Sequence, residues 1–279
     1  ETTMLAVPIS QLGLTLSLAI LEVGRFATFT FATVFWLLRH PARWCRPRLL
    51  IPQLYTVGVA SIPVVAMTGA FIGMVLALEG YDQFQAIGQE GRLGGIINVS
   101  VVKQIGPVLA AVMVAGRVGG ALSAELGTMR VTEQLDAMRA MAADPIPYLV
   151  VPRVVACVLM TPVLTIYSDL LGVWGGWLIT VKVYGVSAFE YWDFTQYFVN
   201  WWEPTSGLIK SVFFGTAIGL IACYKGFSCS AGAAGVGRAA TEAFVTSFLA
   251  IIVINLLLAR VLNDINSTFI ETGAVSAFG

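Results

Sequence analysis

The chain has 279 residues, of which 57% are hydrophobic and only 11% are charged, and its mean hydropathy is +0.83. These values are typical of an integral membrane protein and exclude an ordinary water-soluble enzyme. Because the formal net charge is zero, binding to nucleic acid has no electrostatic support. The single histidine and the four cysteines, which form no CxxC pair, do not indicate a metal site or a Cys/His nucleophile.

The first apolar run covers residues 12–38 and contains Glu22 and Arg25, three positions apart. An ionisable pair near the middle of a span is costly in hydrocarbon, so we expect an interfacial or elbow helix here. A basic segment at 39–48 follows, with four arginines in ten residues, and predicts the cytoplasmic side of the membrane. Residues 1–50 are therefore interpreted as an N-terminal unit with a cytoplasmic N-terminus.

Further apolar stretches predict five transmembrane helices. Four are close to the roughly 20 residues that a span requires, and the third is longer, with prolines and glycines that predict kinks or a break. Successive spans place the loops alternately on the cytoplasmic and the outer side of the membrane. The segments assigned to the cytoplasmic side hold ten lysines and arginines, whereas the outer loops and the tail hold two. An aromatic loop at 182–206 suits the outer headgroup layer. We therefore expect an all-α membrane protein with a permease-like domain at 51–265 and an outer tail at 266–279. The predicted spans are 54–78, 96–115, 146–181, 207–224 and 244–262.

The most polar stretch, residues 123–147, lies between the second and third spans. Apolar residues recur at helical spacing on one side and charged residues fill the other positions, which predicts one amphipathic helix over about 123–142. Ser123 is suited to cap this helix, and the Asp-Pro-Ile-Pro run at 144–147 is suited to end it. Such a helix could dock a soluble partner or lie in the headgroup layer, and periodicity alone does not decide between them. The apolar side consists of Leu126, Met129, Met138 and Met141.

Two lysines, Lys103 and Lys210, fall within predicted spans towards their outer ends. No carboxylate is expected in register with either, so each could simply extend its ammonium to the headgroups. Alternatively, both cations could face one cavity in the outer leaflet and attract an anionic headgroup. Asp169 and Gln104 could then supply hydrogen bonds, or could serve packing alone.

The sequence contains no nucleophile–base pair, no acid/base carboxylate pair and no metal-ligand spacing, so we expect neither catalytic residues nor a metal site. It also lacks a GxxxxGK[ST] phosphate-binding loop, so any ATP hydrolysis requires another chain. An alternative interpretation is an ion- or proton-coupled secondary transporter of a hydrophobic or anionic solute. No internal repeat supports that alternative.

Residues 124–138, Ala-Glu-Leu-Gly-Thr-Met-Arg-Val-Thr-Glu-Gln-Leu-Asp-Ala-Met, closely resemble the signature of the MlaE family of ABC-transporter permeases. The similarity continues through 144–153 and covers about residues 50–262. Other segments that resemble the family are Gln53-Leu54-Tyr55-x-Val57-Gly58, Gly69-x-Phe71-Ile72-Gly73-Met74-Val75-Leu76, Gly106-Pro107-Val108, Ala115-Gly116-Arg117, Leu208-Ile209-Lys210-Ser211 and Gly235-Val236-Gly237-Arg238-Ala239.

The resemblance implies a homodimeric, non-enzymatic permease subunit in the inner membrane of a Gram-negative bacterium. It implies transport of phospholipid to or from a periplasmic MCE-domain lipid carrier. The implied partners also include a small STAS-domain protein and a cytoplasmic P-loop ATPase, which would bind ATP and magnesium. This chain itself is expected to bind no cofactor, and the C-terminus is expected in the periplasm.

By the same resemblance, the polar helix is the coupling helix that docks on the ATPase. The residues expected to take part are Glu125, Leu126, Gly127, Thr128, Met129, Arg130, Thr132, Glu133, Gln134, Asp136 and Arg139. A lipid cavity at the dimer interface would involve Leu76, Leu78, Tyr81, Lys103, Gln104 and Lys210. The family often has a basic–acidic pair where this chain has Lys103-Gln104, so any role that needs a carboxylate there stays open, as does the headgroup preference.

Overall fold

The computed structural model describes residues 2–39 and 45–271, and all the elements within that part are helices. This confirms the predicted all-α class. The α-helices are α1 (Thr2–Arg39), α3 (Pro47–Val57), α4 (Ile62–Gln85), α5 (Leu93–Ser100), α6 (Gly106–Val114), α7 (Gly120–Val131), α8 (Gln134–Ala140), α9 (Val151–Trp177), α10 (Ala188–Phe198), α11 (Trp202–Phe227) and α12 (Ala233–Ile265).

Short 3₁₀ and π turns join several of these helices into longer segments. Six segments of the described chain are long and apolar enough to cross a membrane, and five of them contain the predicted spans. These five are Pro47–Gln85, Glu90–Val131, Ile146–Val183, Trp202–Phe227 and Ala233–Thr268.

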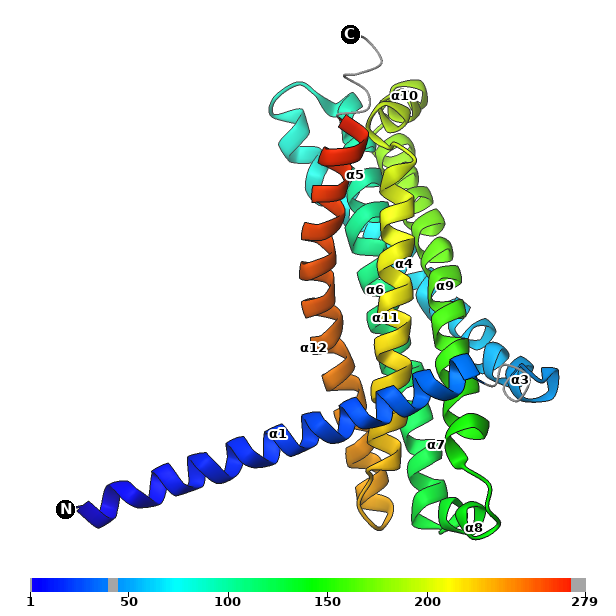
Figure 1. Ribbon diagram of the computed structural model, residues 1–279. Coiled ribbons are helices and arrows are strands. Elements are labelled where there is room, and N and C mark those ends of the chain that lie inside the picture. Colours follow the sequence, from blue (N-terminus) through cyan, green and yellow to red (C-terminus); the bar gives the residue numbers. More distant parts are fainter. Residues whose placement is uncertain (1, 40–44, 272–279) are drawn as a thin grey trace.

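The sixth segment, Ile20–Arg39 in α1, has the length and hydropathy of a span although we expect an interfacial helix there. In Figure 1 α1 crosses the bundle obliquely near one end, whereas the other long helices run alongside one another. This direction is the one expected of a helix that follows the membrane surface. Residues 40–44 of the predicted basic segment and residues 272–279 of the predicted tail lie outside the described residues.

Helix α9 lies at the centre of the bundle, packed against α4 on one side and α11 on another, and α12 packs against α11 and α7. The main core includes Leu164 of α9 together with Phe214 and Ile218 of α11, all of them fully buried. The two ends of the bundle differ (Figure 1). One end, called here the α8 end, carries α8 and the α11–α12 connection, and the other, the α10 end, carries α10 and α5.

Small residues let α4 and α9 approach closely, as small-residue pairs in spans usually do. A Cβ atom added to Gly69 would lie 2.5 Å from the carbonyl oxygen of Ser168, and one added to Gly73 would overlap the carbonyl group of Gly172. Both obstacles are backbone atoms of α9, which cannot rotate away as a flexible side chain could. The helix contact at this position therefore requires glycine.

The aromatic loop predicted at 182–206 contains a helix, α10, that packs on α5. Its Tyr191 is fully buried, donates a hydrogen bond to Asn98 Oδ1 at 3.0 Å and has its pKa raised to about 12, chiefly by burial. Asn98 Nδ2 in turn donates to Thr195 Oγ1 at 2.9 Å. Tyr197 and Trp201 are largely exposed, as a headgroup layer would require, so only part of the aromatic set follows that interpretation.

We expect Tyr191→Phe to destabilise the protein, because it leaves the buried Asn98 carbonyl oxygen without its donor. One buried hydrogen bond contributes about 1 kcal/mol, so the thermal unfolding midpoint in detergent should fall by a few degrees. Tyr197→Phe is the matched control, since Tyr197 is 82% exposed, and it should leave the midpoint unchanged. Equal midpoints for the two variants would contradict this role of Tyr191.

Candidate functional site

The polar stretch between the second and third spans forms two helices, so the prediction of one helix over about 123–142 is wrong. Helix α7 ends at Val131, and α8 begins at Gln134. Glu133 between them has a φ of 60°, a left-handed conformation that no α-helix can contain. The break lets α8 turn away from the axis of α7 and lie at the tip of the bundle (Figure 1).

Ser123 does not cap a helix, because it is buried inside α7. α7 continues the second span through the π turn at Ala115–Gly119, so Glu90–Val131 is one uninterrupted helical segment. Leu126 and Gly127 also face inwards: Leu126 packs against Phe227, and Gly127 lies beside Cys229. These predicted docking residues hold α7 in the bundle, as the partly buried Met129 also does.

Two charged residues of α7 bind other parts of the same chain. The Glu125 carboxylate forms an ion pair with Arg153 of α9 at 3.1 Å, and the Arg153 side chain is only 6% exposed. The Arg130 guanidinium donates to the carbonyl oxygen of Phe227 at the end of α11. Because partly buried charged hydrogen bonds are stronger than exposed ones, these contacts fix α7 firmly to α9 and α11. Arg153 and the Phe227 carbonyl were not predicted, since both are distant in sequence.

The remaining predicted docking residues lie on the exposed tip. Asp136 and Arg139 form an ion pair at 3.0 Å on α8, with both side chains more than half exposed. Beside them a groove of about 410 Å³ runs between α8 and the α11–α12 connection. The connection supplies the wall at 229–231, and no feature of the sequence pattern indicates that these residues lie there. The other exposed docking residues at this tip are Thr128, Thr132, Glu133 and Gln134.

A second polar group lies towards the α10 end. Lys103 of the π turn Val101–Ile105 forms an ion pair with Glu203 of α11 at 3.1 Å, so the expectation that Lys103 has no carboxylate partner is wrong. Lys210 Nζ donates to Gln104 Oε1 at 2.6 Å and to the carbonyl oxygen of Lys103 at 3.1 Å. Glu203 and Lys210 are seven residues apart on α11, and this spacing places both on one face of the helix.

Lys210 is 1% exposed, which excludes the alternative that its ammonium extends to the headgroups. Gln104 accepts one of the hydrogen bonds that the buried Lys210 ammonium donates, so a neutral amide serves as its side-chain acceptor. Lys103 keeps 29% of its side chain exposed and is the cation that a bound headgroup could reach. Asp169 is not part of this cluster; its buried carboxyl lies against Gly106.

The predicted lipid-cavity residues of α4 lie in a separate group. Leu76 and Tyr81 pack on the buried cluster around Leu93 and Ile97. The Tyr81 ring also stacks on Tyr184 with centroids 3.7 Å apart. Leu78 is exposed, and it does not belong to the hydrogen-bonded cluster of Lys103, Gln104, Glu203 and Lys210. One chain therefore presents a polar group and an apolar α4 surface at distinct places.

Both candidate sites lie in a part of the chain that matches a known protein family. The family model described as Permease MlaE matches residues 50–261, which include the Lys103–Lys210 cluster and the α7–α8 tip. The chain belongs to the MlaE permease family.

This MlaE-family chain is similar to several curated proteins over most of its length. It is 42% identical over 239 residues to a probable ABC transporter permease protein of Rickettsia felis, an alignment that covers 86% of this chain and 91% of the relative. It is 37% identical over 215 residues to the intermembrane phospholipid transport system permease protein MlaE of Haemophilus influenzae, covering 77% of this chain and 82% of the relative. The family and the long apolar helices together indicate a multi-pass membrane permease.

Proposed function

We propose that this MlaE-family permease is the membrane subunit of an ATP-driven ABC transporter that moves phospholipid between a bacterial inner membrane and a periplasmic MCE-domain lipid carrier. It would act as a homodimer with a cytoplasmic P-loop ATPase and a STAS-domain protein. The observation that carries the proposal is the exposed α8 tip, which follows α7, a helix that Glu125 and Arg130 attach to α9 and α11. The name of the Haemophilus relative supports phospholipid as the substrate.

The tip is suited to pass on movement of an ATPase. Helix α8, seven residues long, follows the firmly attached α7 and lies beside a groove of about 410 Å³, so a docked ATPase could push or pull on it. From there the helical segment Glu90–Val131 runs without a break to Lys103, whose carbonyl oxygen binds Lys210 of α11. Force applied at α8 would pass through the turn at Thr132–Glu133 to α7, and from α7 along this one helical segment to the polar cluster at the α10 end.

The proposed orientation places the α8 end in the cytoplasm and the α10 end in the periplasm, because the basic residues concentrate at the α8 end. In this orientation the Lys103 cluster lies in the outer half of the membrane. The partly exposed Lys103 ammonium would bind the phosphate of a lipid, and the apolar residues Leu76 and Leu78 of α4 would contact acyl chains.

Reconstitution tests the function. Proteoliposomes that contain this chain, its ATPase and the carrier should transfer labelled phospholipid only when ATP is present. A variant ATPase without its phosphate-binding lysine provides the control and should not support transfer. Transfer that follows an imposed ion or proton gradient without ATP would contradict the proposal and favour a secondary transporter.

Replacing Lys103 with Leu should lower the amount of phospholipid that copurifies with the dimer. The loss of one charge-assisted contact, about 1.5 kcal/mol, corresponds to roughly tenfold weaker binding. Lys210→Leu should weaken binding too, by releasing Gln104 and the Lys103 carbonyl, but this change also affects folding because Lys210 is buried. The exposed Lys182 supplies the control, Lys182→Leu. Unchanged bound lipid in Lys103→Leu would contradict the cationic headgroup site.

A further inference from the structure

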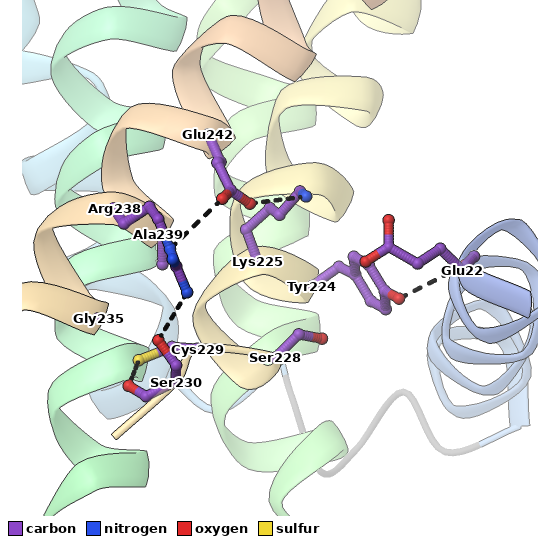
Figure 2. Close-up of a pocket in the computed structure, with 10 residues that line it drawn as sticks. All are labelled: Glu22, Tyr224, Lys225, Ser228, Cys229, Ser230, Gly235, Arg238, Ala239 and Glu242. Atoms are coloured by element: carbon purple, nitrogen blue, oxygen red, sulfur yellow. Dashed lines mark hydrogen bonds and ion pairs between the residues drawn. The ribbon is translucent and has the colours of Figure 1, made fainter. Parts of the chain in front are cut away.

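Two adjoining hollows lie between α1, α11 and α12, on the side of the α8 end where α1 crosses the bundle. The first has a volume of about 190 Å³ and is lined mainly by polar and charged side chains (Figure 2). The second has a volume of about 330 Å³ and is lined mainly by apolar side chains, among them Val23, Phe26, Ile221 and Ala250. Both are lined by Glu22, Tyr224 and Lys225, so they form one continuous site with a charged part and an apolar part.

The charged part carries an excess of one positive charge on its α11–α12 side. Lys225 Nζ lies 3.0 Å from one Glu242 carboxylate oxygen, and Arg238 Nε lies 3.7 Å from the other. Two cations thus share a single carboxylate (Figure 2). Arg238 also donates to Ser230 Oγ at 3.1 Å, and the Ser228 side chain lines the same hollow. Cations that retain donors, together with hydroxyl groups, are suited to bind a phosphate group.

The opposite side of the hollow is acidic. The Glu22 side chain projects from α1 beside the Tyr224 hydroxyl, which donates to the backbone carbonyl oxygen of Glu22 at 3.4 Å (Figure 2). Among residues 2–39 and 45–271, no cation forms an ion pair with the Glu22 carboxylate. The hollow therefore presents a carboxylate outside any ion pair on one side and an excess positive charge on the other. A ligand with both an ammonium and a phosphate group matches this arrangement.

The apolar part suggests what else the ligand contains. Val23 is 68% exposed and Phe26 is partly buried, and both line the second hollow together with Ile221 of α11 and Ala250 of α12. An acyl chain that enters this groove would cover apolar surface of α1 at the same time as that of α11. The charge pattern and the groove together favour a lipid over a water-soluble phosphate compound.

We propose that this hollow binds a phospholipid with an ethanolamine headgroup from the cytoplasmic leaflet. The phosphate would contact Lys225 and Arg238, the ammonium would contact Glu22, and one acyl chain would occupy the groove beside Ala250. A choline headgroup cannot donate a hydrogen bond to Glu22, and a glycerol headgroup has no positive charge, so both should bind less well. The site lies at the opposite end of the bundle from Lys103, and the leaflet assignment rests on the orientation proposed above.

Photocrosslinking tests the site in the intact complex. The complex is placed in phosphatidylcholine nanodiscs with one trace phospholipid that carries a diazirine on an acyl chain, and labelled peptides are identified by mass spectrometry. The ethanolamine probe should label peptides that contain 22–26 and 221–250 at least severalfold more than choline or glycerol probes do. Glu22→Gln, Lys225→Met and Ala250→Trp should each lower this labelling severalfold, the last by filling the groove without a change in charge.

The control is Arg260→Gln, which removes an exposed ion pair with Asp264 elsewhere on α12 and should leave labelling unchanged. Equal labelling by the three probes, or unchanged labelling in all three variants, would overturn the proposal. Competition by glycerophosphoethanolamine as effective as by the intact lipid would overturn the acyl-chain assignment. Labelling of peptides near Lys103 reports lipid at the proposed transport site in the same experiment. Loss of the labelling near Lys103 alone would count against the proposed transport site and not against the hollow lined by Glu22 and Lys225.

Discussion

Reversing the charge of Glu133 or Asp136 is expected to disconnect the ATPase while the permease stays folded. Both side chains lie on the exposed tip, and the Asp136 ion pair with Arg139 is more than half exposed, so its loss should cost under about 1 kcal/mol of stability. The left-handed backbone conformation at position 133 is as accessible to lysine as to glutamate, so the substitution adds no backbone strain. At an interface, however, a reversed charge meets like charge, which costs several kcal/mol. ATPase association and ATP-dependent lipid transfer should therefore fall by roughly thirtyfold or more.

Copurification of the ATPase with Glu133→Lys and Asp136→Lys permease measures the first effect, and the reconstituted transfer assay measures the second. Asp264→Lys is the matched control, because it also breaks an exposed ion pair within one helix, at the far end of α12. Normal ATPase association and normal transfer in both tip variants would show that the tip is not the docking surface.

Gly73→Ala should destabilise the bundle more than any other single methyl addition discussed above. The new Cβ would overlap the Gly172 carbonyl group, so α4 and α9 would have to move apart along the most extensive helix contact in the chain. Overpacking of a tight contact costs about 1–3 kcal/mol, and more where backbone meets backbone. We expect a clear loss of monodisperse protein and a lowered unfolding midpoint.

Gly24→Ala provides the matched control for this change. Nothing lies within 4 Å of a Cβ added at Gly24, and alanine favours helix over glycine by up to about 1 kcal/mol. The control should therefore unfold at the same or a slightly higher temperature. If Gly73→Ala behaves like Gly24→Ala, the close contact of α4 and α9 is not what stabilises the bundle.

The long helices follow from hydropathy alone, because a span must be apolar over a fixed length and must satisfy its own backbone hydrogen bonds. The break at Glu133 could not be predicted in this way. The segment around it contains no glycine, proline or asparagine, and its apolar residues keep helical spacing across the break. The contacts of Glu125 and Arg130 that fix the end of α7 join residues distant in sequence, so no local pattern shows where α7 stops.

The polar contacts were predicted less well than the helices. The pairing of Lys103 with Glu203 joins residues 100 positions apart, and no local pattern determines which face of α11 meets the second span. The spacing of Glu203 and Lys210 was the one available signal, since it places an acid on the same face as a buried cation. The α10 helix was missed because its aromatic residues were attributed to the membrane interface, whereas Tyr191 is needed to attach α10 to α5.

We propose that this MlaE-family chain works as a lipid permease driven by a separate ATPase. Native mass spectrometry of the chain, purified gently from its own membranes, tests it most directly. We expect a complex with two copies of the chain, a P-loop ATPase and bound phospholipid. A chain that carries no ATPase, even when the genes that neighbour its own are co-expressed, would show that it does not work as an ABC permease.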